Sequence, residues 1–227
     1  MPKKTDPPHD TVAIRAEIKR FLAKESPPGK RIGTYPVGVY AFYDYDREPI
    51  YVGQTYEGLG ARIGRHLTNQ RTDAVAMNVL DPFEVAEIEV WPLFDIPVKN
   101  WSNKPPPEFV ERLNNLEFSV FQHALAHSTF RAVLNEKLPK GQVIQLSKSI
   151  RGSIIPAELF EKRKHPDVRT ARRATTIAAL ARVISERKVS PGLRRTLHTQ
   201  ARRLEALAKA RLADFANIPE AEDEDAE

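Results

Sequence analysis

The sequence predicts a mixed α+β fold, in which helices flank a small three-stranded sheet and a basic helical extension follows. A run rich in β-branched and aromatic residues turns back on itself at 37–52, and apolar and polar residues alternate over 84–91. Apolar residues then recur at helical spacing, first over 108–127 and later through most of 157–215. A period of two residues indicates strands, and a period near 3.6 indicates amphipathic helices.

The first elements precede the sheet. Residues 1–10 are polar and Pro-rich, and Ile14 and Ile18 then recur at helical spacing, which predicts a short helix. The Ser-Pro-Pro-Gly segment at 26–29 ends that helix and acts as a linker.

The predicted sheet comes next. Strands at 37–43 and 50–52 enclose a polar turn, Asp-Tyr-Asp-Arg-Glu, as expected for a hairpin. A helix is expected over about 58–69. The alternating stretch 84–91 forms the third strand, and Pro92 ends it or places it at an edge.

Helices fill the rest of the chain. Three consecutive prolines lead into a helix over about 108–127 with a continuous apolar stripe. Three more are expected over about 157–164, 167–188 and 193–215, with Ser-Pro-Gly breaking the last two apart.

Four regions follow from these elements. A tail and helix occupy 1–30, the sheet domain 31–140, a basic helical region 141–215, and an acidic tail 216–227. The acidic tail has the composition of a disordered segment.

The basic charge is concentrated in the C-terminal third. The net charge is +5, but six acids lie in the last eight residues, and without them 35 basic and 24 acidic residues remain. Between Glu161 and Arg211 there are 15 Lys/Arg and 4 Asp/Glu. A polyanion is the partner that this predicts. The alternative is a solvated helical surface.

Composition also excludes several classes of protein. The chain has no cysteine, so disulfides, thiolate metal sites and cysteine nucleophiles are excluded, and a cytoplasmic location is expected. No apolar run of 18 residues occurs and the N-terminus has no apolar core of a signal peptide, so no membrane partner is expected.

Glu117 is the first residue with a candidate chemical role. It lies four residues after Leu113 and four before Phe121, so it follows the apolar stripe of its helix. A buried carboxylate without a partner is costly. It is therefore either an edge residue that pairs with an arginine or a metal ligand, since Mg²⁺ is commonly held by one carboxylate plus substrate phosphate oxygens.

Arg62 and His66 share one face of the helix predicted before it, four residues apart. A guanidinium can stabilise charge that develops on a phosphate, and an imidazole can orient or deprotonate a hydroxyl. Tyr40 and Tyr51, on the two hairpin strands, would act as bases only beside a cation or histidine, because the ordinary tyrosine pKa is about 10. Each of these features alone is also compatible with packing or a solvated surface.

The ordered set resembles the GIY-YIG nuclease family over about residues 35–137. Gly-Val-Tyr40 and Tyr51-Val-Gly stand for the two signature triplets, each with Val in place of Ile. Arg62, His66 and Glu117 follow in the family's order, and Asn135 matches an asparagine found in the family's restriction enzymes. The resemblance implies a small three-stranded antiparallel sheet flanked by helices.

The resemblance also implies a mechanism. Glu117 would hold one divalent ion, Mg²⁺ or Mn²⁺, Tyr40 would activate the attacking water, and Arg62 would stabilise charge on the phosphate. Tyr51 and His66 would orient the phosphate or assist proton transfer, with Asn135 as a further site residue. The function implied is a metal-dependent endonuclease acting on DNA, with restriction or phage defence as the expected setting.

Nucleic-acid binding is assigned to the basic residues. The eight candidates are Arg65, Arg169, Arg172, Arg173, Arg194, Arg195, Arg202 and Arg203. They would hold duplex or single-stranded DNA through its phosphates. Alternatives are a homo-oligomer formed through the C-terminal helices, a binding protein that does not cleave, and a repair or recombination nuclease that recognises branched DNA.

Overall fold

The structure is a computed structural model that describes residues 9–26, 29–67, 80–96 and 106–216. Within these residues the fold is mixed α+β, with six α-helices, a two-stranded sheet and a four-stranded sheet, both antiparallel. The predicted fold class is confirmed at this level.

The main sheet has the order β4-β3-β5-β6. Its strands are β3 (Gly38–Tyr43), β4 (Pro49–Thr55), β5 (Glu87–Pro92) and β6 (Ile150–Ser153). The first three are the predicted strands. The fourth was not predicted, because a four-residue edge strand with the sequence Ile-Arg-Gly-Ser has no apolar alternation. The sheet therefore draws on residues assigned from sequence to the helical region.

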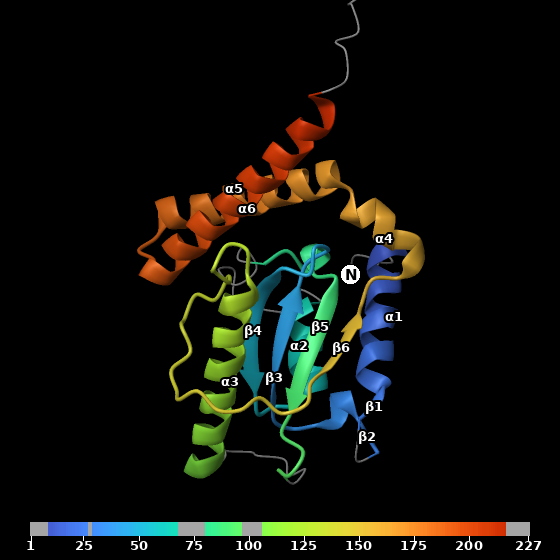
Figure 1. The fold of residues 1–227 in the computed structure, drawn as a ribbon, viewed down its shortest axis with the longest axis vertical. Coiled ribbons are helices and arrows are strands. Elements are labelled where there is room, and N and C mark those ends of the chain that lie inside the picture. The colour runs from blue at the N-terminus through green and yellow to red at the C-terminus, as the bar shows by residue number, and fades with distance from the viewer. Residues whose placement is uncertain (1–8, 27–28, 68–79, 97–105, 217–227) are drawn as a thin grey trace, which may run out of the picture.

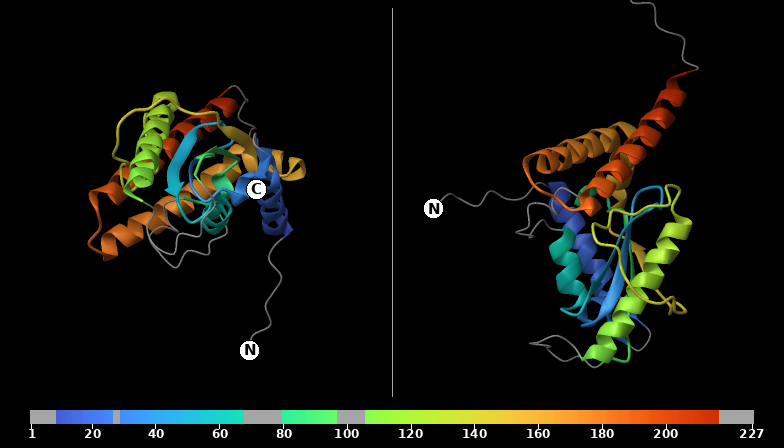
Figure 2. Two further views of the ribbon diagram at one scale, coloured as in Figure 1. Left: turned by 90° about the horizontal axis from the view of Figure 1, so that it is seen from below. Right: turned by 90° about the vertical axis from the view of Figure 1, so that its left-hand side faces the viewer.

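Helices cover both faces of the sheet (Figures 1 and 2). α3 (Pro107–His127) lies on one face, where its apolar stripe meets Val39, Ala41 and Val52. On the other face, α1 (His9–Ala23) and α2 (Leu59–Leu67) pack with Phe42. Central strand β3 is buried along its whole length, which explains its continuous run of apolar and aromatic residues.

The small sheet replaces part of the predicted linker. β1 (Glu25–Ser26) pairs with β2 (Lys30–Arg31) directly after α1. Most of the chain between α2 and the third strand, 68–79, lies outside the described residues.

The predicted C-terminal helices are present as α4 (Ala157–Lys164), α5 (Pro166–Glu186) and α6 (Pro191–Phe215). α5 and α6 form a hairpin across one end of the sheet (Figure 1). Leu180 and Leu193 from this hairpin belong to the same apolar cluster as the sheet and α2. No helix among the described residues is both long and apolar enough to cross a membrane.

A buried ionic cluster joins the hairpin of helices to the sheet. Asp44, in the β3–β4 turn, accepts hydrogen bonds at one oxygen, Oδ2, from Arg169 at 3.1 Å, Arg173 at 2.9 Å and Arg203 at 2.7 Å. Its other oxygen caps the turn by accepting from two backbone N–H groups. Arg173 also donates to Glu84 at 3.0 Å, so a second buried carboxylate shares the positive charge.

Candidate active site

Tyr40 and Tyr51 lie side by side on neighbouring strands. Tyr40, on central strand β3, is fully buried, and Tyr51, on edge strand β4, is partly exposed. Their ring centroids are 6.2 Å apart, and Phe42 stacks on Tyr51 at 5.9 Å. The hairpin therefore directs both tyrosines to the face of the sheet that α2 covers.

Gly53 makes room for the Tyr40 hydroxyl. It is the residue opposite Tyr40 in the pairing of β3 with β4. A Cβ atom at Gly53 would lie 2.7 Å from the Tyr40 hydroxyl oxygen and 2.8 Å from Cε1 of Tyr51. The glycine of the second triplet thus lets Tyr40 lie across the backbone of the outer strand, so its role is steric.

α2 brings Arg62 and His66 to the Tyr40 hydroxyl. The hydroxyl oxygen is 3.1 Å from Nδ1 of His66, and Nε of Arg62 donates to the same oxygen at 3.4 Å. The His66 ring meets Tyr51 edge-on, with centroids 4.7 Å apart. The expectation that the i, i+4 pair shares one face is confirmed, and that face points to the two tyrosines.

Glu117 approaches the same region from α3, which packs on the opposite face of the sheet. Burial raises the pKa of Glu117 to about 7, although the charge of Arg62 and a hydrogen bond from the Gln54 backbone act in the opposite direction. Arg62 therefore interacts both with the Tyr40 hydroxyl and with Glu117. The site straddles β4, and its parts come from both faces of the sheet.

A hydrogen bond between β4 and α3 anchors the helix that carries Glu117. The Gln54 side-chain amide donates to Asn114 of α3 at 3.0 Å. Asn114 and Glu117 are three residues apart and therefore share a helix face. This contact joins the end of β4 to the part of α3 that carries the carboxylate.

Asn135 lies on the outer edge of β4. Its side-chain oxygen accepts from the Val52 backbone N–H at 3.0 Å, and its amide nitrogen donates to the Val52 carbonyl at 2.6 Å. Leu134 donates to the Ile50 carbonyl at 2.8 Å, so Leu134 and Asn135 together pair with the edge strand on either side of Tyr51. Both polar atoms of the Asn135 side chain are thus engaged by the backbone of β4.

The donor set fits a single-carboxylate metal site. The described residues contain no group of three or more His, Cys, Asp or Glu side chains arranged to hold a metal ion. Glu117 is a half-buried carboxylate that is incompletely compensated, as its raised pKa shows. A divalent cation would offset that desolvation, with substrate oxygens completing its shell. His123 and His127 form an exposed pair on α3 with ring centroids 4.1 Å apart. In the described part of the chain, no third His, Cys, Asp or Glu side chain joins them to form a metal site.

The structure corrects part of the predicted nucleic-acid surface. Arg169, Arg173 and Arg203 are only 2%, 5% and 2% exposed, because the Asp44 cluster holds them inside the protein. They cannot reach a polyanion in this structure. Sequence composition did not reveal this, because their carboxylate partner lies more than 120 positions away.

The other five candidates keep some exposure. Arg65 pairs with Glu57, and Arg172 donates to Asp81 at 3.0 Å. Arg194, Arg195 and Arg202 are exposed on α6. The predicted cationic surface is therefore smaller than expected and is concentrated on one helix.

Comparison of the chain with family models, with curated proteins and with solved structures finds no match. The resemblance to GIY-YIG nucleases thus remains a prediction from the residues themselves. The structure adds geometry: Arg62 and His66 both lie at the Tyr40 hydroxyl, Tyr51 packs against His66, and Glu117 lies within electrostatic reach of Arg62.

Proposed function

We propose that the protein is a metal-dependent endonuclease that hydrolyses phosphodiester bonds in DNA. The observation that carries the proposal is the Tyr40 hydroxyl, which lies 3.1 Å from Nδ1 of His66 and accepts from Arg62 at 3.4 Å. A tyrosine that only packs in a core does not need a histidine and an arginine at its oxygen. The half-buried Glu117 beside Arg62 supports the same function.

In this reaction a water oxygen forms a new bond to phosphorus while the bond from phosphorus to the leaving sugar oxygen breaks. The Tyr40 oxygen takes a proton from the water, and Nδ1 of His66 is placed to receive the hydroxyl proton of Tyr40. Arg62 orients that hydroxyl and presents a permanent positive charge for the equatorial phosphate oxygens. The leaving oxygen takes its proton from solvent.

Glu117 is the residue that would hold the cation, Mg²⁺ or Mn²⁺. When bound, the ion would neutralise charge on the phosphate oxygens. The carboxyl must be ionised for this, and its pKa of about 7 means that protons compete with the metal near neutral pH.

The test is cleavage of supercoiled plasmid, single-stranded circle and forked duplex with Mg²⁺ by wild type, Tyr40→Phe and Glu117→Gln. Each variant is expected to lose about 10²–10³-fold or more in rate, as when a group that acts in the transition state is removed. The forked substrate separates a structure-specific nuclease from a general one.

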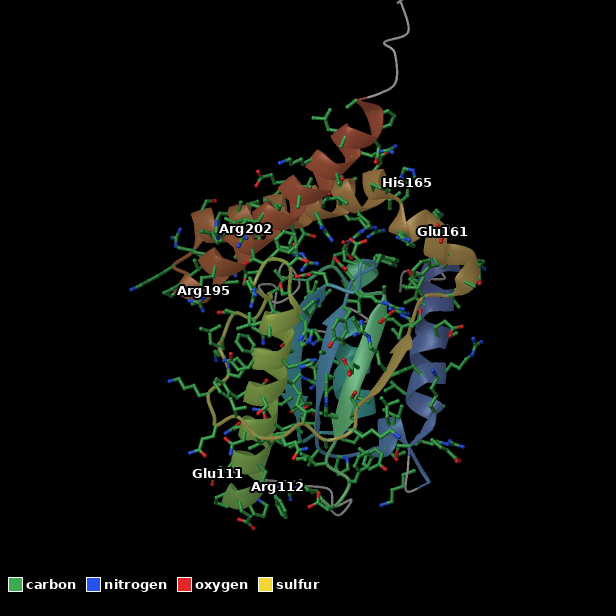
Figure 3. The ribbon with its side chains drawn as sticks, in the orientation of Figure 1. Glu111, Arg112, Glu161, His165, Arg195 and Arg202 are labelled. Carbon is green, nitrogen blue, oxygen red and sulfur yellow. The ribbon has the colours of Figure 1, made fainter. Side chains whose placement is uncertain are left out.

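Two matched controls lie on the same elements. Tyr43→Phe removes a hydroxyl from the same strand, but that hydroxyl donates to Glu89 on the face that α3 covers. Glu111→Gln changes an exposed acid on α3 (Figure 3). Both should cut like wild type. Equal residual cutting by wild type and the two site variants would show that the assigned residues do not catalyse cleavage.

A further inference from the structure

The N-terminal half of α6 lies against residues 130–136, a segment that follows α3 and borders the candidate site. Ser190 donates to the Glu136 carboxylate at 2.9 Å, and Arg195 donates to the Glu136 carbonyl at 3.3 Å. A Cβ atom at Gly192 would lie only 2.0 Å from that carbonyl oxygen, so the helix and the segment are in direct contact. Further along, Arg202 donates to the Phe130 carbonyl at 3.2 Å.

That segment is in turn bound to the strand that carries Tyr51. Leu134 and Asn135 hydrogen-bond to the backbone of Ile50 and Val52, the two residues on either side of Tyr51. One layer of backbone therefore separates α6 from the outer strand of the site. Because the segment contacts α6 through side-chain hydrogen bonds and close packing, and β4 through hydrogen bonds to its backbone, it fixes the position of α6 relative to β4.

The cations on this part of α6 are not neutralised. Arg194, Arg195 and Arg202 are exposed, and within the described part of the chain none of them forms an ion pair. Arg195 and Arg202 donate only to carbonyl oxygens, which leaves their charge uncompensated. Figure 3 places both at the end of the hairpin that overlies α3. By contrast Arg211, further along α6, forms ion pairs with Asp167 and Asp214.

We propose that Arg194, Arg195 and Arg202 form a phosphate-binding surface that holds the nucleic-acid backbone beside the candidate site. The proposal rests on the proposed function. Arg195 and Arg202 are seven residues apart and share a helix face, which spans about 10 Å at 1.5 Å per residue. That length matches about three nucleotides of a duplex strand at 3.4 Å each. Contact is with phosphates, so it carries no base preference.

The proposal is tested by binding of a labelled 30-base-pair duplex in EDTA, where metal-dependent cleavage is silent, over about 50–200 mM salt. The triple variant Arg194→Ala, Arg195→Ala, Arg202→Ala should weaken binding at least about tenfold and reduce the log–log salt slope by about 2–3, roughly one unit per phosphate contact. The triple lysine variant at the same positions should keep most of the slope, because it keeps the charge.

The matched control removes three charges from the far edge of the sheet. Three exposed lysines lie there, Lys19 on α1, Lys24 directly after it and Lys30 on β2, and α1 contacts the opposite edge strand, β6. Their triple alanine variant should bind nearly like wild type. Equal losses in the two alanine triples, or an unchanged salt slope in the arginine triple, would overturn the proposal.

A single substitution tests the proposal without the risk that the triple variant fails to fold. Within the described residues the Arg194 side chain forms no hydrogen bond or ion pair, so Arg194→Glu should fold normally and still weaken binding, and unchanged binding contradicts the proposal. Failure of the proposed function looks different: no variant cuts DNA with Mg²⁺, while the arginine-dependent binding persists. Cutting that does not depend on these arginines, with unchanged binding, removes only the proposal for α6.

Discussion

Two groups of charged residues, the Asp44 cluster and the Glu117 site, contain the same residue types but balance their charges differently. In the cluster, one oxygen of a buried carboxylate accepts from three guanidinium groups, and Glu84 supplies a second acid. At the site, Glu117 is half-buried beside Arg62, and its pKa rises to about 7. In the first group one carboxylate is hydrogen-bonded by three buried guanidinium groups, whereas in the second the burial of Glu117 outweighs the nearby charge of Arg62.

The difference separates a structural role from a chemical one. In the cluster, three guanidinium groups on one Asp44 oxygen fix α5 and α6 on the β3–β4 turn. A buried carboxylate whose charge is only partly offset favours a bound cation, because the cation lowers the cost of keeping the carboxylate ionised.

The largest effect is expected at Asp44. Asp44→Ala leaves three buried guanidinium groups with Glu84 and, for Arg169, the exposed Asp46 as acidic partners, and loss of one partner from such a group costs about 3–5 kcal/mol. Urea unfolding followed by far-UV circular dichroism measures this. Asp46→Ala is the control, since Asp46 binds Arg169 at 2.7 Å but is 59% exposed at its side chain and should cost under about 1 kcal/mol. Similar losses for the two would contradict the comparison.

Gly53→Ala is expected to reduce cleavage about 100-fold, because a displacement of about 1 Å at a reacting group has that order of effect. The new methyl group would lie 2.7 Å from the Tyr40 hydroxyl, which must move away from His66 and Arg62. Plasmid nicking rates give the measurement. Gly64→Ala is the control, since a Cβ atom there meets nothing within 4 Å. Unchanged nicking by Gly53→Ala would show that the position of this hydroxyl does not limit the rate.

Glu117→Gln should stabilise the metal-free protein above neutral pH. The folded-state pKa of about 7 exceeds the ordinary 4.5, so the folded state holds this proton more tightly. The group therefore costs nothing at low pH, and its cost grows as pH rises from 4.5 to 7 and then stays constant. The variant should gain about 1–3 kcal/mol over wild type at pH 8 and little at pH 4, at about 1.4 kcal/mol per pKa unit.

The same pair of proteins tests the metal without any cleavage assay. Mg²⁺ at pH 8 should raise the unfolding temperature of wild type but not of Glu117→Gln, because a cation that binds the ionised carboxylate stabilises only the folded state. Equal shifts in both proteins would mean that Mg²⁺ binds elsewhere.

Sequence patterns revealed the elements whose signals are local. The strands of the hairpin, the alternating strand and the helices α3 to α6 follow from periodicity, and their bounds agree with the structure within a few residues. The ordered triplets also led to the residues that meet at the Tyr40 hydroxyl. Strand β6 was missed because its pairing with β5, and not its own composition, makes it a strand.

The arginines show why a count of basic residues in the sequence does not identify the exposed cationic surface. Arg169 and Arg203 look no different in sequence from Arg195 and Arg202, and all four lie on helices with thin apolar stripes. Only the long-range partner Asp44 decides which of them are buried. Likewise, nothing in the sequence around Asn135 indicates that its side-chain amide makes the hydrogen bonds to Val52 that the backbone of a neighbouring strand would make.

Asn135→Ala is expected to have the smallest effect. The variant loses two hydrogen bonds to Val52 at the outer edge of β4, each worth about 0.5–1.5 kcal/mol, while water can replace part of them. We expect a loss of about 1–2 kcal/mol in unfolding free energy and a rate reduction under about tenfold, because Asn135 acts on Tyr51 only through the strand. Urea unfolding and single-turnover cleavage of the same preparations separate the two. A rate loss as large as that of Glu117→Gln, with full stability, would instead make Asn135 a catalytic residue.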